Sequence, residues 1–476
     1  MEDFIFALQV QFQGLLQMIL VLGIGGSFPY GFHISVINYP SHIRKFINET
    51  WVDRHGSSLH PDTIMLLWSF IVSVYGIGGF LGSLLLLVTA QQSETALFMA
   101  LSKTAKSFEM ILVGRFLYGI GSGFSLNIHP QYVGEISPKK LRGFTNSTVA
   151  VFLTLGKLTG QVVGLREILG SEALWPWLLA SSGLSALLQL VTLPFFPDSP
   201  SYLLIQKGNE EACRKAIRKL WGEGDHQAEI DDIMKEKGAM ASTKTLRVLE
   251  VIKERSLRWQ PLWAEGAALG WILADVLCAG TAHHDPVTAG KEAAAFWLLP
   301  QPTFLLLTLR RCRKASDSGR KYKALLLCCV SNGLISLVSH FQHRFFWMHY
   351  FSVILIFLFV VFYGIGPSTI SVMVEIFSQS YRPSAFLIVG CINWMGLFVL
   401  GMIFPVIVDN LGPFCFLIFL GILALSAIFI YLYLPETKGK SIMEIKAEFN
   451  KLNFGRKETS VTENNFPKEQ VSCTKL

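Results

Sequence analysis

The apolar residues of this chain form long continuous runs separated by short charged segments, rather than the spaced pattern of amphipathic helices. The runs are near the length of about 20 residues that a helix needs to cross a bilayer. We predict about eleven membrane-spanning helices, over residues 15–37, 64–88, 110–128, 144–166, 174–196, 262–282, 293–309, 324–341, 346–372, 384–408 and 413–434.

A twelfth span is suspected between residues 89 and 109. The apolar run there reaches only from Ala96 to Leu101 and is followed by Lys103 and Lys106. The segment is therefore short and charged for a helix that crosses a bilayer.

The composition also indicates a membrane protein. Of the 476 residues, 51% are hydrophobic and 16% are charged, whereas about a quarter of a typical soluble chain is charged. Lys and Arg retained on the cytoplasmic side explain the net charge of +7, and no basic stripe with interleaved aromatic residues indicates a nucleic-acid partner. Because the 8 Cys show no metal-ligand spacing, we expect no bound metal. No bound cofactor is expected either.

The distribution of basic residues predicts which side of the membrane each loop occupies. Placing the four basic segments in the cytosol puts both termini there and leaves the loop 38–63 outside. That loop contains Asn48-Glu49-Thr50, an N-glycosylation acceptor that needs an outside face. The four basic segments are residues 139–142, 201–258, 310–323 and the tail after Lys438.

An internal repeat divides the chain into two halves. Glu135 precedes Arg142 by the same spacing as Glu375 precedes Arg382, and the two arginines lie 240 residues apart. Two halves of about six spans each are the parallel-repeat plan of major facilitator transporters.

A second match supports the repeat, because Pro197 and Pro435 each end an apolar run and lie 238 residues apart. We predict two transmembrane bundles joined by a cytosolic helical linker and followed by a cytosolic tail. Their boundaries are 1–200, 201–258, 259–440 and 441–476.

Three strings resemble the signatures of the facilitative hexose transporters, sugar porters of the major facilitator superfamily. They are residues 130–143, 197–204 and 435–440. Residues 161–166 and 194–196 are similar to the fructose-transporting branch. The resemblance implies an all-α polytopic membrane protein of two six-helix bundles in the plasma membrane. It also implies a uniporter of fructose or glucose that works by alternating access, with a small neutral sugar as its partner and no enzymatic activity.

The resemblance assigns three residues to sugar binding. Gln161, expected in mid-span, matches a family glutamine that binds sugar hydroxyls, and Asn393 with Trp394 matches the family's Asn-Trp pair. An amide offers a donor and acceptors to a polyol, and an indole face can stack on a sugar ring. The structural alternatives are a hydrogen bond between helices for Gln161 and a packed aromatic beside a satisfied amide for Trp394.

The repeated charges predict an inner gate. Opposite charges at the cytosolic ends of neighbouring spans can pair when the gate is shut and separate when it opens. Positive-inside loop charge alone would explain the arginines, but it explains two carboxylates at matched spacing poorly. The gating set is Glu135, Arg142, Glu375, Arg382, Arg115 and Arg320.

One position bears on ion coupling. Proton-coupled sugar porters carry an Asp, and uniporters an Asn, where this chain has His33. A His at this place could sense pH, but we expect a histidine in a wet cavity that takes no part in coupling. The missing carboxylate favours a uniporter.

The chain departs from the family in three places. Residues 86–95 lack the family's Gly-Arg-Lys/Arg motif and most of a third span, and residues 261–300, where the seventh span is expected, match nothing in it. The tenth-span motif at 366–371 lacks two prolines. A degenerate or variant product without transport activity is therefore the alternative function, while the long sugar-porter strings disfavour an unrelated drug exporter.

Overall fold

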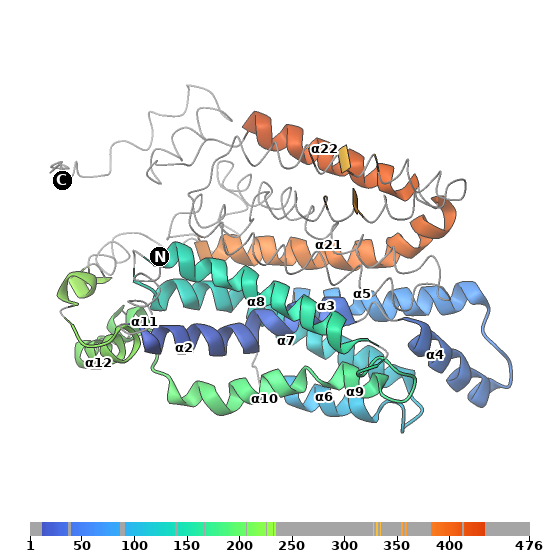
Figure 1. Cartoon of the computed structure of the whole chain (residues 1–476), viewed down its shortest axis with the longest axis horizontal. Coiled ribbons are helices and arrows are strands. Elements are labelled where there is room, and N and C mark those ends of the chain that lie inside the picture. Colours follow the sequence, from blue (N-terminus) through green and yellow to red (C-terminus); the bar gives the residue numbers. More distant parts are fainter. Residues whose placement is uncertain are drawn as a thin grey trace.

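The computed structural model is helical, with no strand among the residues that it describes (Figure 1). The described residues are 12–36, 40–85, 91–138, 141–165, 167–205, 207–224, 226–231, 233–234, 327, 330–331, 334, 354–355, 358, 382–411 and 414–433.

Long helices lie side by side in one bundle (Figure 1). The first span consists of α2 (Gln13–Leu22), the π-helix η1 (Gly23–Ser27) and α3 (Phe28–Val36). The later helices of the first half are α5 (Pro61–Leu85), α6 (Gln91–Leu101), α7 (Phe108–Ile136), α8 (Arg142–Val163), α9 (Trp175–Ala180), α10 (Gly183–Thr192) and the 3-10 helix η2 (Leu193–Phe195). The second half contributes α21 (Arg382–Leu411) and α22 (Cys415–Tyr433).

Five described segments are long and apolar enough to cross a membrane, and each overlaps a predicted span. They are Gln13–Val36, Pro61–Leu84, Phe108–Ile136, Trp175–Phe195 and Ser384–Ile403. The predicted spans between residues 262 and 372 lie outside the continuously described part of the chain.

The bundle has two ends that its short helices distinguish (Figure 1). One end carries α4 (Pro40–His55) and is called the α4 end, and the other carries α11 (Pro200–Ile205) and α12 (Glu210–Trp221) and is called the α12 end. Because the long helices run from one end to the other, the position of a residue along its helix shows which end of the bundle it is near.

Glycines bring pairs of helices into backbone contact. A β-carbon on Gly31 of α3 would collide with the carbonyl of Leu153 in α8, and one on Gly78 of α5 with the carbonyl of Phe116 in α7. Small residues suit membrane helices, since close packing replaces the hydrophobic driving force that lipid removes. The pairs α3–α8 and α5–α7 are accordingly among the most extensive packings in the described chain.

The suspected twelfth span is a short helix. α6 has 11 residues and is therefore about 17 Å long, roughly half of the 30 Å thickness of a bilayer core. It packs on α7, where the Met99 side chain would contact a β-carbon on Gly114 at 2.8 Å. A full span at 89–109 is absent from the described residues, because the chain has too few apolar residues there.

The described part of α5 ends beside the middle of α7. The Ser83 hydroxyl donates to the carbonyl of Gly123 at 3.4 Å, so the last residues of α5 lie beside about residue 125 of α7. The remaining turns of α7, about 17 Å of helix, continue beyond this point toward the α12 end.

The predicted loop 38–63 contains a helix that the polarity of its sequence obscured. In α4, Ile43, Phe46 and Ile47 occupy one face and are buried in a cluster with Trp175. Helical spacing of these three residues in a polar segment was the available signal.

α12 shows how local sequence and packing agree. Asn209 caps its first turn by accepting from the backbone N–H of Ala212 at 2.9 Å, and Gly222 ends it with a φ of 82°. The Trp221 indole N–H donates to the carbonyl of Ile136 at 2.8 Å. The apolar face of α12 packs on α2, and this contact holds α12 at its end of the bundle.

Candidate functional site

The two halves of the chain meet where α21 packs along α5. Trp394 of α21 is fully buried in this seam, and a β-carbon on Gly79 of α5 would collide with its indole ring. Tyr30 and Tyr75 meet the indole edge-on, each with ring centroids 5.4 Å away. The predicted sugar platform is thus covered by aromatic neighbours in this conformation, as a packed aromatic would be.

Arg115 lies next to this aromatic group and is 2% exposed. Its Nη1 donates to the carbonyl of His33 at 3.0 Å, and its guanidinium lies 4.5 Å from the ring centroid of Tyr75. A cation over an aromatic face is favourable, more so away from water. No carboxylate is buried among the described residues, so carbonyl and aromatic groups are the contacts seen for Arg115.

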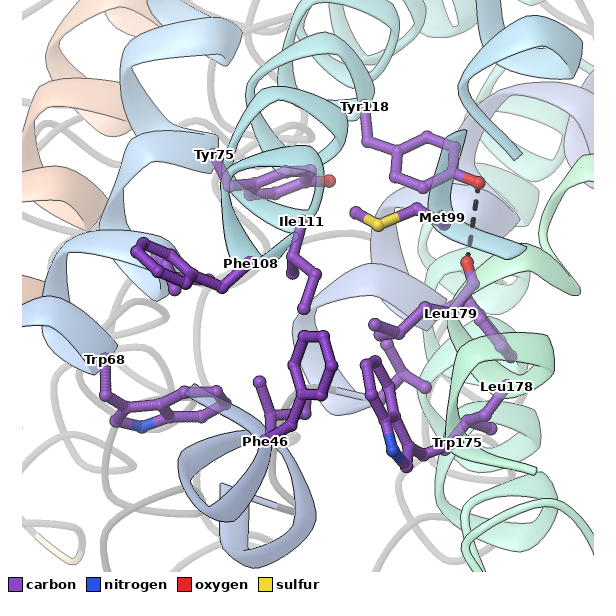
Figure 2. Packing of buried hydrophobic residues seen from close by; sticks show 14 of the residues in the cluster. Phe46, Trp68, Tyr75, Met99, Phe108, Ile111, Tyr118, Trp175, Leu178 and Leu179 are labelled. Atoms are coloured by element: carbon purple, nitrogen blue, oxygen red, sulfur yellow. Dashed lines mark hydrogen bonds between the residues drawn. The ribbon is translucent and has the colours of Figure 1, made fainter. Parts of the chain in front are cut away.

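His33 stacks near Tyr118, with ring centroids 4.0 Å apart, and is 2% exposed. The expected wet cavity around His33 is therefore wrong, because aromatic rings fill the space. The hydroxyl of Tyr118 donates to the carbonyl of Leu179 at 3.4 Å, which connects the group to α9 (Figure 2).

Figure 2 shows how the same apolar core extends toward the α4 end. Rings from α4, α5, α7 and α9 converge on one space, and aliphatic side chains fill what the rings leave. The labelled residues are Phe46, Trp68, Tyr75, Met99, Phe108, Ile111, Tyr118, Trp175, Leu178 and Leu179.

Gln161 is buried but lies two residues before the end of α8, rather than in mid-span as expected. The preceding Gly160 packs against the hydroxyl of Ser35 near the end of α3. Tyr30, which contacts Trp394, lies five residues earlier on α3, or about 8 Å along its axis. Gly160 also contacts Phe32, which is two residues from Tyr30. Gln161 therefore lies about one turn of helix farther toward the α4 end than the contact between Tyr30 and Trp394.

Asn393 precedes Trp394 on α21 and is half-buried. Asn393 lies beside the seam, and its contact with sugar stays a prediction.

The predicted gating residues fall at both ends of the bundle. Glu135 lies at the α12 end of α7, where its carboxylate accepts from the Ser199 hydroxyl at 3.0 Å. Arg142 is the first residue of α8 at the same end. Arg115 lies 20 residues from Glu135 on α7, about 30 Å away along the axis, so the two cannot belong to one gate.

The second-half gating residues are less fully described. Arg382 is the first residue of α21, and the side chains of Arg142 and Arg382 lie outside the description. Glu375 and Arg320 lie outside the described residues altogether.

Exposed ion pairs join the elements at the α4 end. Lys45 of α4 bonds Glu172 at 2.5 Å, and this hydrogen bond lowers the pKa of Glu172 and raises that of Lys45. Arg54 pairs with Glu109, and Lys106 with Asp53 at 2.8 Å. These contacts attach α4 to the start of α7 and to the segment after α8.

The predicted glycosylation acceptor lies within α4. Asn48 is half-buried, and its side-chain oxygen accepts from the backbone N–H of Leu59 at 3.2 Å. Thr50 of the same acceptor is buried. The acceptor therefore belongs to a helix, whereas a loop was expected.

Sequence reasoning missed buried polar residues in α7. The Ser27 hydroxyl lies 2.6 Å from Nδ1 of His129, which ties the π-helix η1 to α7. Asn127 is also buried, and its amide nitrogen has no hydrogen-bond partner in the described part of the structure. Polar residues within the apolar run of α7 were the available signal, since such residues are costly at membrane depth.

Comparison with known proteins gives the family. The family described as "Sugar (and other) transporter" matches residues 18–270 and 318–449. The facilitated glucose transporter member 5 of Ovis aries is 38% identical over 471 residues, covering 91% of each chain. The human facilitated glucose transporter member 11 is 37% identical over 473 residues, covering 94% of this chain and 95% of its own.

Solved structures agree on the fold. The proton:xylose symporter XylE bound to 6-bromo-6-deoxy-D-glucose matches with a TM-score of 0.69 and 18% identity, covering 92% of this chain and 100% of its own. XylE of E. coli in a partially occluded inward-open conformation matches with a TM-score of 0.70 and 18% identity, covering 90% and 100%.

The predicted all-α major facilitator fold and the resemblance to hexose transporters are thereby confirmed. Members of the matched family move sugars across membranes and are not enzymes. The chain belongs to the sugar transporter family of the major facilitator fold, with the facilitated glucose transporters of solute carrier family 2 among its relatives.

Proposed function

We propose that this sugar transporter is a facilitative hexose uniporter, which carries fructose or glucose down its gradient by alternating access. The names of the relatives, facilitated glucose transporters, support a hexose and a facilitated mechanism. The strings at 161–166 and 194–196 support the fructose-transporting branch.

The surroundings of Arg115 carry the argument against proton coupling. A coupled symporter needs a group that binds and releases a proton as the sugar moves. Arg115 contacts the His33 carbonyl and the Tyr75 ring, and no buried carboxylate lies among the described residues. A buried arginine with no acidic partner in the described part of the chain supports a transporter whose cycle needs no ion.

The substrate site in this proposal lies between the halves. Asn393 and Gln161 supply amides to sugar hydroxyls, and Trp394 supplies a ring face once the halves separate and uncover it. A neutral polyol needs such groups and no buried charge.

The inner gate in this proposal is at the α12 end. Glu135 and Arg142, which the structure brings to that end, pair with the repeat-related Glu375 and Arg382 when the gate is shut. Arg320 belongs to the same end by its basic loop. Arg115 lies about 30 Å from Glu135 along α7, and its proposed role is to position the aromatic residues around Trp394.

We place the chain in the plasma membrane with both termini in the cytosol. The bundles 1–200 and 259–440, the linker 201–258 and the tail 441–476 follow from the repeat and the loop charges. The α4 end then faces outward, which supports Asn48 as a glycosylation site.

Uptake into vesicles tests the proposal. The full chain, reconstituted into liposomes, is expected to equilibrate labelled fructose or glucose at a rate that an imposed pH gradient does not change. Accumulation above the outside concentration, driven by protons, would overturn the uniporter. A hexose rate equal to that of empty liposomes would instead favour the second candidate.

The second candidate is a variant that does not transport. The short α6, about half the thickness of a bilayer core, favours it, because a full set of spans is expected to shield the path from lipid. Restoring a full-length third span should then create uptake that the natural chain lacks.

A further inference from the structure

We infer that Asn127 of α7 is a sugar ligand, which the sugar contacts on its way between the seam at Trp394 and the α12 end. The inference rests on the proposed sugar transport and adds a contact that neither the sequence motifs nor the repeat assigns. Its basis is a buried amide at the junction of the two halves.

The amide of Asn127 reaches across the seam. A β-carbon on Gly390 of α21 would lie 2.8 Å from the side-chain oxygen of Asn127 and 3.3 Å from its nitrogen. The bare backbone at Gly390 therefore gives the amide its space. Gly390 lies one turn before Trp394 on α21, so Asn127 sits next to the residue proposed to receive the sugar ring.

The hydrogen-bonding state of Asn127 indicates a ligand. The residue is 6% exposed, and its amide nitrogen has no partner among the described residues. Leaving a buried donor without a partner is unfavourable, and native structures rarely do so without a functional reason. A sugar hydroxyl would supply the acceptor when the two halves open toward the α12 end.

The position of Asn127 along α7 places it on the α12 side of the seam. α5 covers α21 at Trp394, but its last residues lie beside about residue 125 of α7. Asn127 lies one turn of α7 beyond Gly123, the partner of Ser83. Gly390 lies on the Arg382 side of Trp394, so Asn127 contacts α21 between the seam and the α12 end.

Binding and transport measured on the same variants test the inference. Sugar affinity of the purified full chain is followed by thermal stabilisation with fructose and glucose, and uptake is followed in liposomes. Asn127→Leu should weaken binding about fivefold or more, the effect of losing one hydrogen bond. The maximal uptake rate should change less than the half-saturation concentration, and Asn127→Gln should recover part of the affinity.

A sugar series separates contact from structure. Among analogues that each lack one hydroxyl, the analogue missing the hydroxyl bound by Asn127 should be weaker than its parent in the natural chain and equal to it in Asn127→Leu. Gly390→Ala, which displaces the amide, should give the same loss, and the double variant should be no worse. Asn410→Leu is the matched control, since Asn410 is exposed and already bonded to Val406.

The outcomes distinguish the inference from the proposed function. Sugar binding without uptake would overturn the uniporter while leaving the ligand role to be decided by the binding data. Unchanged affinity and unchanged analogue ranking in Asn127→Leu would overturn the ligand role. Absence of both binding and uptake in the natural chain would overturn both.

Discussion

At the scale of single residues, the distinctive feature of this transporter is a set of polar side chains buried within its long helices. Arg115, His33 and Asn127 are all less than a tenth exposed, although each lies in a helix that spans the bundle. Ionisable and amide groups at membrane depth are costly and are retained where they bind substrate or hold a partner. The aromatic rings around Arg115 supply part of that stabilisation.

Replacing Gln161 by Leu tests the proposed sugar amide. The change removes hydrogen bonds to sugar and should weaken binding by roughly 1–3 kcal/mol, or about 5- to 150-fold in the half-saturation concentration of uptake. Gln17→Leu is the control, because Gln17 is exposed on α2. A half-saturation concentration that stays at the natural value would assign Gln161 to helix packing.

Charge reversal tests the inner gate. Arg142→Glu should place like charges together at the α12 end and increase the time that this end is open. Adding Glu375→Arg should restore part of the natural balance. The readout is alkylation of a cysteine placed in the inner cavity, and equal alkylation rates in all three proteins would remove these residues from the gate.

Sequence reasoning located some of these residues and missed others for physical reasons. Trp394 and Glu135 were found because motifs and a repeat mark them. Asn127 was missed because its role depends on the bare backbone of Gly390, which lies in the other half of the chain. The depth of Gln161 was wrong because an apolar run does not mark where its helix ends, here at Val163.

At the scale of helices, apolar runs predicted the spans well and the lengths poorly. The described spans of the first half coincide with predicted runs, apart from the short α6. α4 was missed because its apolar face of Ile43, Phe46 and Ile47 is narrow and its other residues are polar. Helix ends depend on which neighbour is present, and that information is absent from the local pattern.

α12 offers a test of how a helix outside the spans is held. Leu220 is fully buried against α2, so Leu220→Ala should lower the free energy of unfolding by about 2–5 kcal/mol and release α12 first. Lys215→Ala, on the exposed face, should change it by less than about 0.5 kcal/mol. Thermal unfolding in detergent and hydrogen exchange in α12 measure the two effects. Equal melting temperatures would show that α12 is not part of the cooperative unit.

At the scale of the whole molecule, the orientation in the membrane follows from loop charge and has a direct test. Asn48 should carry a glycan when the chain is made in microsomes, whereas an acceptor introduced in 201–258 should not. The reverse pattern would invert the topology. Because Thr50 is buried in α4, a variant that moves the acceptor into residues 56–60 is the control for access.

The indole of Trp394 over Gly79 has a mechanical consequence for the transport cycle. A large ring seated in a backbone notch resists translation along the seam, because the ring would first have to leave the notch. A tilt of α21 about this contact leaves the ring in its notch. Within the first half, the backbone contacts at Gly31 and Gly78 keep their helix pairs together as one body. The contact at Trp394 therefore favours rotation of one half relative to the other over sliding. The transport cycle would then proceed through changes in the angle between the two halves.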